Sequence, residues 1–173
     1  MFATSNNHLM RERCQGRSIC GMPLTPLTSE EEAVMRAIGR MMLVLPRVLD
    51  ADLERSERMS MSEYTALRHL SEADGRRLRM SVLAARCDMS LSGMTRLAGR
   101  LEQLGYLARH RCERDARGLE AVLTDAGLRR LEQAWPKHLE SVRRRIFDHL
   151  TDLDMGKLAK ALESISCAEE DHC

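Results

Sequence analysis

The stretch "YLARHRCERDARGLEAVL", residues 106–123, determines the fold class of this 173-residue chain. Side chains alternate between two faces in residues 106–111 and again in 119–123, and a period of two predicts two β-strands. Residues 112–118, "CERDARG", carry four charged side chains, end in Gly and include no large apolar side chain. They therefore predict the long, exposed tip of a β-hairpin.

Helical spacing of apolar residues is found on both sides of the hairpin. The helices are expected over residues 28–58, 60–74, 81–87, 90–104, 124–150 and 151–166. Their expected starts are a capping box of Thr28 with Glu31 or of Ser29 with Glu32, boxes of Ser60 with Glu63 and Thr151 with Asp154, and caps at Ser90 and Thr124. Pro46 and Pro136 lie inside predicted helices and should bend them.

The two helices before the hairpin predict a helix-turn-helix, because the short helix 81–87 and helix 91–104 are joined by the tight turn "CDMS". At 100° per residue, Ser92, Thr95, Arg96 and Gly99 share one face of the second helix, opposite an apolar face. In a helix-turn-helix the second helix enters the DNA major groove, and its N-terminal residues meet base edges. An ordinary amphipathic surface helix is the alternative interpretation.

Positive charge is concentrated around this region. Residues 76–117 hold ten Arg against four acidic residues, a net charge of +6, in a chain whose net charge is only +1. A basic hairpin after a helix-turn-helix is typical of a wing, whose Arg117 would enter the minor groove while Asp115 orients it and Gly118 lets the tip turn. The predicted DNA-binding residues are Ser90, Ser92, Thr95, Arg96, Arg100, Arg109, Arg111, Arg114, Asp115, Arg117 and Gly118. A solvated, Arg-rich surface is the alternative.

Several function classes have no support in the sequence. There is no HExxH, GxSxG or Gly-rich phosphate loop, so we expect neither an enzyme nor a bound cofactor. No apolar run is long enough to span a membrane and no export signal is present, so we expect a cytoplasmic protein. The six Cys show no CxxC and no metal-ligand spacing, so we expect reduced thiols and no metal.

The chain resembles the MarR family of bacterial transcription regulators. The residues that carry the resemblance are "SEYTALRHL", "LAARCDMSLSGMTRLAGRLEQLGYLAR" and, above all, "RDARGLEAVLTDAG", within residues 28–167. The resemblance implies a homodimer with a winged helix-turn-helix in each subunit, and a repressor that releases a palindromic operator on binding a small aromatic or phenolic acid, or on thiol oxidation. A winged-helix interaction module without DNA binding is the alternative from another class.

The expected fold is therefore mainly α with a small β-hairpin wing, a winged helix-turn-helix plus a helical dimerisation lobe. We expect a flexible tail over residues 1–27, the dimerisation lobe over 28–60 and 124–167, the DNA-binding domain over 61–123, and an acidic end over 168–173.

The sequence is compatible with two kinds of regulatory switch. A small-molecule pocket is expected where the first, second and fifth helices meet the DNA-binding domain, with Arg40, Met41, Tyr64, Arg68, His69 and His138 as candidates. An Arg or His there could pair with a ligand carboxylate. The rival is a redox switch at Cys14 and Cys20, since the nearby Arg residues could lower a thiol pKa. The helix 28–58, where the family's sensing Cys lies, contains none.

Overall fold

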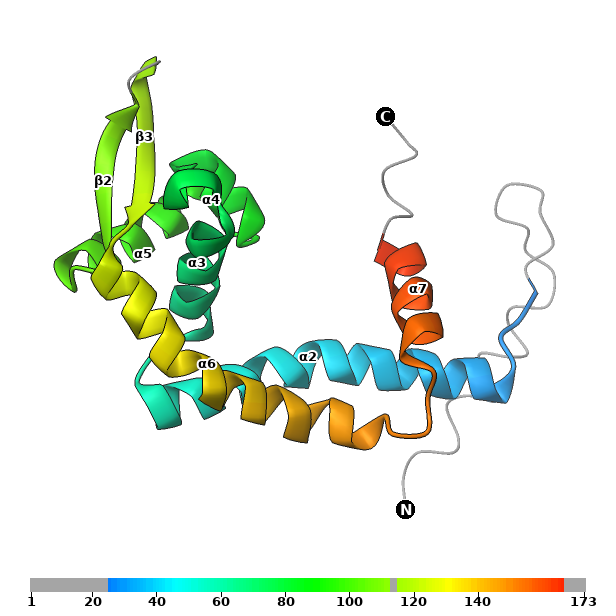
Figure 1. The fold of residues 1–173 in the computed structure, drawn as a ribbon. Coiled ribbons are helices and arrows are strands. Elements are labelled where there is room, and N and C mark those ends of the chain that lie inside the picture. The colour runs from blue at the N-terminus through cyan, green and yellow to red at the C-terminus, as the bar shows by residue number, and fades with distance from the viewer. Residues whose placement is uncertain (1–24, 113–114, 167–173) are drawn as a thin grey trace, which may run out of the picture. The chain divides into compact units, whose positions relative to one another are not determined.

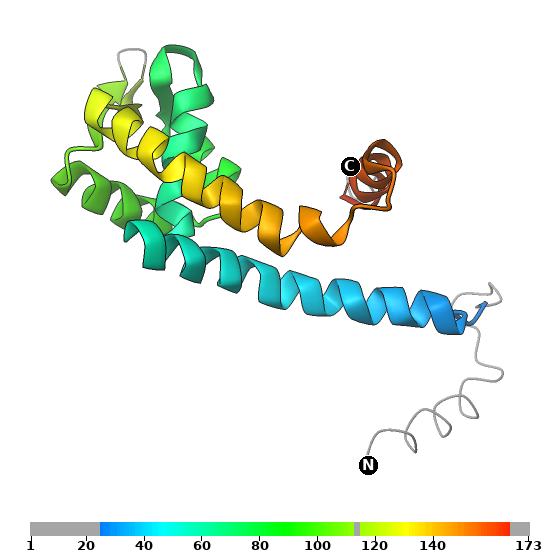
Figure 2. The same ribbon diagram turned by 60° about the horizontal axis from the view of Figure 1, so that its bottom comes forward.

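The computed structural model describes residues 25–112 and 115–166, except for the side chains of 112, 115–117 and 166. It divides into two compact units, residues 1–42 and 43–173. The predicted fold class is confirmed, since helices dominate and one small sheet carries the wing (Figures 1 and 2). The elements are α2 Ser29–Glu57, α3 Met61–Glu72, the 3-10 turn Asp74–Arg76, β1 Arg77–Arg79, α4 Met80–Arg86, α5 Leu91–Gln103, β2 Leu107–Cys112, β3 Asp115–Leu123, α6 Asp125–Arg145, the 3-10 turn Phe147–His149 and α7 Met155–Ser166.

Most helices begin at the residues that the capping patterns predict. Thr28 Oγ1 accepts the Glu31 amide at 3.2 Å while Glu31 Oε2 accepts the Thr28 amide at 2.7 Å, so the first of the two possible boxes forms. The box of Ser60 with Glu63 and the Ser90 and Thr124 caps are also confirmed. Both α2 and α6 continue through their internal Pro residues.

Two helix boundaries differ from the prediction. Asp154 is not the third residue of a capping box with Thr151, because α7 begins only at Met155. Asp154 Oδ1 instead accepts the Lys157 amide at 3.0 Å, which makes Asp154 the residue that caps α7. The helix expected to reach residue 150 ends at Arg145 and is followed by a 3-10 turn.

The sheet has three antiparallel strands in the order β1-β3-β2, so the predicted hairpin gains a strand that the sequence did not reveal. β1 is only three residues long, too short for alternation to identify it. Leu107 and Ala121 are buried and belong to the core cluster, so the side of the sheet that carries them packs against the helices.

The tip differs from the prediction. β3 already begins at Asp115, so Gly118 lies inside a strand and does not form the tip turn. The pairing with β2 shifts from Arg111 opposite Leu119 to Cys112 opposite Asp115, which places Gly118 at a strand irregularity instead.

The core of unit 43–173 lies where α3, α4 and α5 meet the sheet. Leu67, Leu83, Met94 and Ala121 are among its fully buried residues. The helices α4 and α5 pack against one another as the predicted helix-turn-helix. Within the described ranges, no helix combines the length and the apolar character that crossing a membrane would need.

The junction between the sheet and α6 explains the Gly at the end of "LTDAG". Thr124 Oγ1 donates to the Gly105 carbonyl at 2.7 Å and accepts the Gly127 amide at 3.0 Å. A Cβ added to Gly127 would lie 2.0 Å from the Tyr106 carbonyl oxygen, a backbone atom that cannot move aside without shifting the start of the hairpin. Only Gly therefore allows α6 to begin here.

We expect Gly127→Ala to lower the free energy of unfolding by about 1–3 kcal/mol, the usual cost of overpacking a buried site. Gly39→Ala is the matched control, since a Cβ at this helical position meets nothing within 4 Å. It should change stability little or raise it by up to about 1 kcal/mol. Urea unfolding followed by circular dichroism tests both, and an unchanged Gly127→Ala midpoint would contradict the packing described above.

Candidate nucleic-acid interface

The helix α5 has one buried face and one exposed polar face. Met94, Leu97, Ala98 and Leu101 are buried in the core. The predicted recognition residues Ser92, Thr95 and Arg96 are all exposed. Burial of the apolar face fixes the rotation of α5, so these three residues face solvent at its N-terminal half.

Hydrogen bonds at the start of α5 restrict its hydroxyl groups. Ser90 Oγ accepts the Gly93 amide at 3.2 Å and lies 3.2 Å from Ser92 Oγ. Thr95 Oγ1 donates to the Leu91 carbonyl at 2.8 Å. Ser90 therefore acts first as the helix cap, and Thr95 presents acceptor lone pairs and a methyl group outward.

The predicted DNA-binding Arg residues fall into two groups. Arg100 Nε pairs with Glu63 Oε1 at 2.9 Å, and Arg109 Nε donates to Glu102 Oε2 at 2.9 Å. The Arg109 bonds also hold the pKa of Glu102 below its usual range. Arg100 and Arg109 thus have partners inside the protein, which sequence spacing alone did not show.

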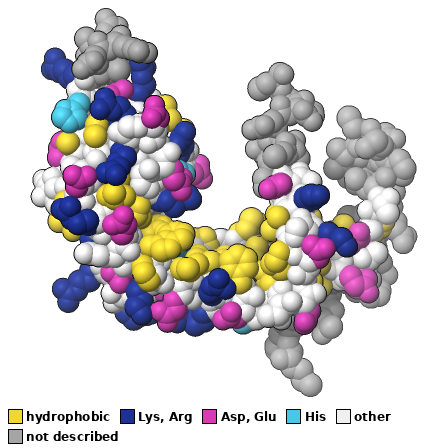
Figure 3. All heavy atoms as spheres, in the orientation of Figure 1, with side chains coloured by type: hydrophobic (Ala, Val, Ile, Leu, Met, Phe, Trp, Pro, Cys, Tyr) yellow, Lys and Arg dark blue, Asp and Glu magenta, His cyan; other side chains and the backbone are white. Residues whose placement is uncertain are grey.

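Arg96 and Arg111 form the second group. Both are exposed, and with the side chains that the structure describes neither makes an ion pair or a side-chain hydrogen bond. Among the predicted DNA-binding Arg residues whose side chains the structure describes, Arg96 and Arg111 therefore have guanidinium groups available to an anionic partner. Figure 3 shows basic side chains spread over the region of α3–α5 and the sheet.

The wing contributes a hollow on the sheet. A cavity of about 320 Å³ is lined by Arg77, His110, Arg111, Glu120 and Val122. Arg114 and the side chains of Asp115 and Arg117 lie outside the described residues, so the predicted hydrogen bond between Asp115 and Arg117 stays a prediction.

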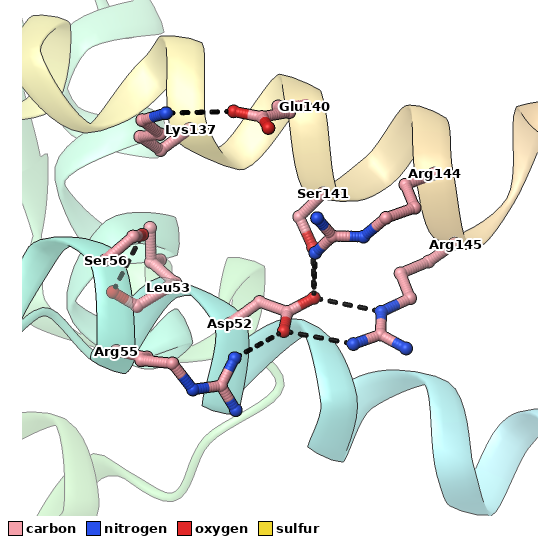
Figure 4. Close-up of polar contacts among 9 residues, drawn as sticks. All are labelled: Asp52, Leu53, Arg55, Ser56, Lys137, Glu140, Ser141, Arg144 and Arg145. Carbon is pink, nitrogen blue, oxygen red and sulfur yellow. Dashed lines mark hydrogen bonds and ion pairs between the residues drawn. The ribbon is translucent and has the colours of Figure 1, made fainter.

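A cluster that the sequence analysis missed joins α2 to α6. Asp52, only 6% exposed, accepts hydrogen bonds from Ser141 Oγ at 2.7 Å, from Arg145 at 2.9 and 3.1 Å, and from Arg55 and Arg144 at 3.0 Å each (Figure 4). We call these five residues the Asp52 cluster. Chiefly the Arg145 and Ser141 bonds hold the pKa of Asp52 far below its usual range, against the opposing effect of burial.

One sequence signal could have revealed this cluster. Asp52 lies three residues after Leu49 and directly before Leu53, so it falls on the apolar stripe of its helix. A charge on a buried stripe requires a partner, and "RRR" at 143–145 supplies candidates. Which helix would bring the partner could not be read from local periodicity.

The structure brings some of the predicted ligand-binding residues together. The rings of Tyr64 and His138 lie 4.4 Å apart. Tyr64 Oη and His138 Nδ1 are buried, and among the described atoms neither has a hydrogen-bond partner. Burial raises the pKa of Tyr64 to about 12, and burial together with Arg68 lowers the pKa of His138, so both are neutral at pH 7.

Of the other candidates, Arg68 lies close enough to Tyr64 and His138 for its charge to act on both. Arg68 and His69 lie on the same helix near Glu72, with Arg68 Nη1 at 3.4 Å and His69 Nδ1 at 3.9 Å from its carboxylate. Arg40 and Met41 are exposed and belong to unit 1–42.

The cysteines offer no described redox or metal site. Cys14 and Cys20 lie outside the described residues. Cys87 is half-buried, and burial raises the pKa of its thiol, which disfavours the reactive thiolate. In the ranges that the structure describes, no group of His, Cys, Asp and Glu side chains could hold a metal ion.

Comparisons with known proteins agree with this geometry. A family model described as "MarR family" matches residues 59–118. AbsC, a MarR family transcriptional regulator from Streptomyces coelicolor, has a crystal structure with a TM-score of 0.73 and 36% identity, covering 83% of this chain and 96% of that one. Sco3205, a MarR family transcriptional regulator from the same organism solved in complex with DNA, gives a TM-score of 0.75 and 33% identity over 83% of this chain and 91% of that one.

A more distant structure shares the fold. A mutant MarR from E. coli, complexed with operator DNA, gives a TM-score of 0.65 at 20% identity and covers 82% of this chain and 99% of that one. No curated protein matches the sequence.

A helix-turn-helix followed by a hairpin on a three-stranded sheet defines a winged helix-turn-helix protein. The identity to AbsC and Sco3205 over most of each chain then specifies the family. The chain belongs to the MarR family of transcriptional regulators.

The Asp52 cluster predicts a pH-dependent contribution to stability. Replacing Asp52 by Asn should lower the free energy of unfolding at pH 7 by about 2–3 kcal/mol, because Ser141 and three Arg side chains lose the buried carboxylate that they share as an acceptor. The folded-state pKa of Asp52 is depressed, so its contribution is complete above the unfolded pKa near 4 and is lost as pH falls below it.

The measurement is urea unfolding of both proteins between pH 3 and pH 8. The difference between wild type and Asp52→Asn should be constant above about pH 5 and should shrink toward pH 3. Asp50→Asn is the neighbouring control, since no Arg contacts its carboxylate among the described residues. A difference that is independent of pH would rule out the ionised carboxylate as the source.

Proposed function

We propose that this protein is a homodimeric, DNA-binding repressor that recognises a palindromic operator and has no enzymatic activity. The observation that carries the proposal is the exposed Arg96, without a partner among the described residues and next to Ser92 and Thr95 on the solvent face of α5. An Arg in this position can bond guanine O6 and N7 in the major groove or contact a phosphate. The relative Sco3205 was solved in complex with DNA, which supports DNA binding by this protein.

The wing extends the proposed interface. Arg111 is exposed near the end of β2, Arg114 follows it in the sequence between the two strands, and Arg117 belongs to β3. Arg residues at such a tip favour a narrow, A·T-rich minor groove beside the major-groove site. We infer that α5 reads bases while the wing fixes position through the backbone and the minor groove.

Exposed apolar side chains support the proposed dimer. In α2, the consecutive residues Met41, Met42, Leu43 and Val44 are all exposed, and Leu43 reaches 73%. In α7, Leu162 and Ile165 are exposed, with Ile165 at 67%. Apolar residues on the terminal helices that stay in water in one chain become buried when a second chain covers them. A two-fold dimer would present two α5 helices about 34 Å apart, the spacing of a palindrome.

Two forms of regulation remain proposals. A phenolic or other small aromatic acid could occupy the neighbourhood of Tyr64 and His138, whose buried polar atoms have no described partner. Thiol oxidation at Cys14 and Cys20 is the alternative, and the raised pKa of Cys87 disfavours that residue as the sensor. An interaction module without DNA binding is the alternative from another class, and the exposed Arg96, which has no partner among the described side chains, speaks against it.

Replacing Arg96 by Ala should weaken binding to the operator by about 1–3 kcal/mol if Arg96 contacts a base, with less effect on nonspecific DNA. Fluorescence anisotropy with operator and scrambled duplexes at several salt concentrations measures both. An equal loss on the two duplexes, with the salt slope reduced by about one, would assign Arg96 to a phosphate instead.

Arg143→Ala is the matched control, because Arg143 is equally exposed but lies in the last turn of α6. It should bind the operator like the wild type. If the wild-type protein binds no duplex at low salt, the proposed function fails.

Replacing Leu43 or Ile165 by Asp should convert the dimer to a monomer, since each substitution places a charge in the proposed interface. Sedimentation equilibrium gives the mass. Leu104→Asp is the control, because Leu104 is also exposed but follows α5 in the DNA-binding domain, and this variant should remain dimeric. Equal masses for all three variants would contradict the proposed interface.

A further inference from the structure

We propose that the cleft beside the Asp52 cluster binds a small polar anion through a carboxylate or phosphate group. The cleft has a volume of about 230 Å³ and lies between α2 and α6. Its lining residues are Asp52, Arg55, Ser56, Lys137, Glu140, Ser141 and Arg144 (Figure 4). All belong to unit 43–173.

The charges of the Asp52 cluster are unbalanced. One carboxylate faces three guanidinium groups, those of Arg55, Arg144 and Arg145. Arg55 contributes only Nη1 and Arg144 only Nη2 to Asp52, although each guanidinium carries five N–H donors. Their side chains are 73% and 54% exposed, so the remaining donors are accessible from the cleft.

The free guanidinium donors of Arg55 and Arg144 favour an oxyanion as their ligand. A planar guanidinium binds carboxylate and phosphate oxygens through paired N–H groups, and a second positive group nearby strengthens such a site. Lys137 supplies that group from α6, where it pairs with Glu140 at 3.0 Å. The Asp52 carboxylate, to which Arg55 and Arg144 already donate, is an example of the chemical group that these donors bind.

The residues that line the cleft also indicate the polarity and size of the ligand beyond its anionic group. It consists of charged side chains and the hydroxyl-bearing Ser56 and Ser141, with no aromatic and no aliphatic residue. The volume corresponds to several water molecules at about 30 Å³ each, which is enough for a small organic acid. A hydroxylated dicarboxylate or a phosphate therefore fits this site better than an aromatic acid, and the site is distinct from the Tyr64 and His138 neighbourhood.

An anion that drew the guanidinium groups of Arg55 and Arg144 away from Asp52 would leave Arg145 and Ser141 as the α6 partners of this carboxylate. Arg130 would still join α2 to α6 through Glu57. Any effect of this change on DNA rests on the proposed function, whereas binding of the anion does not.

Isothermal titration calorimetry of the full chain tests the site with three probes, malate, inorganic phosphate and benzoate. We expect malate or phosphate to bind once per chain. Arg55→Gln and Arg144→Gln should each raise the Kd at least tenfold, and Arg143→Gln, an exposed neighbour outside the cleft, should leave it unchanged. Lys137→Gln should raise the Kd severalfold and leaves every Asp52 contact in place, so it tests the site even where an Arg variant fails to fold.

The results for the three probes distinguish the kinds of ligand. Binding of malate alone assigns a carboxylate ligand, and binding of phosphate alone assigns a phosphate ligand. Binding of benzoate alone, no binding of any probe, or an equal loss in Arg143→Gln and Lys137→Gln overturns the proposal. Operator binding by the same proteins, followed by anisotropy, reports separately on the proposed function.

Discussion

The Asp52 carboxylate accepts a hydrogen bond from Ser141, a residue 89 positions away in the sequence, and the register of α2 against α6 depends on this bond and its neighbours. In the described part of the chain, two polar or charged residues are buried, Asp52 and Ser141, and they are hydrogen-bonded to one another. A slip of either helix by one turn would leave a charge in the interior without donors, which is costly. Arg130, which binds both the carboxylate and the carbonyl of Glu57, fixes the same two helices at a second point.

This constraint extends to the sheet through α6. The helix is capped by Thr124, whose amide donates to the Tyr106 carbonyl at 3.1 Å and whose hydroxyl donates to the Gly105 carbonyl. One continuous helix therefore connects the root of the wing to the cluster on α2. Polar contacts at both ends of α6 thus connect the root of the wing, next to the proposed DNA-binding surface, with α2.

The sequence was sufficient for most of the structure that depends on neighbouring residues, although the local box predicted for Thr151 and Asp154 was wrong. The boxes at Thr28 and Ser60, the cap at Ser90 and the alternating strand faces involve partners within a few positions, so their patterns identified them. The three residues of β1 form a strand only because β3 lies beside them, and no local pattern encodes that partner. The same reason explains why the partner of Asp52 could not be predicted.

The candidate site shows the same division. Helical geometry placed Ser92, Thr95 and Arg96 on one face, because burial of the opposite face follows from the same periodicity. Composition counted Arg100 and Arg109 with the free cations, although Glu63 and Glu102 bind them in the fold. Net charge in a segment therefore overstated the charge that is available to a ligand.

The bonds from Arg109 to Glu102 have a consequence for the geometry of any duplex that the protein recognises. Both the amide and the guanidinium of Arg109 bind the Glu102 carboxylate, so the base of β2 is fixed to the last turn of α5. A helix and a hairpin fixed in this way cannot adjust their separation independently. In the proposed complex, the two grooves contacted by α5 and the wing must then occur at one helical phase. Inserting a single base pair between those contacts, which adds about 3.4 Å and a rotation, would leave only one of them in reach.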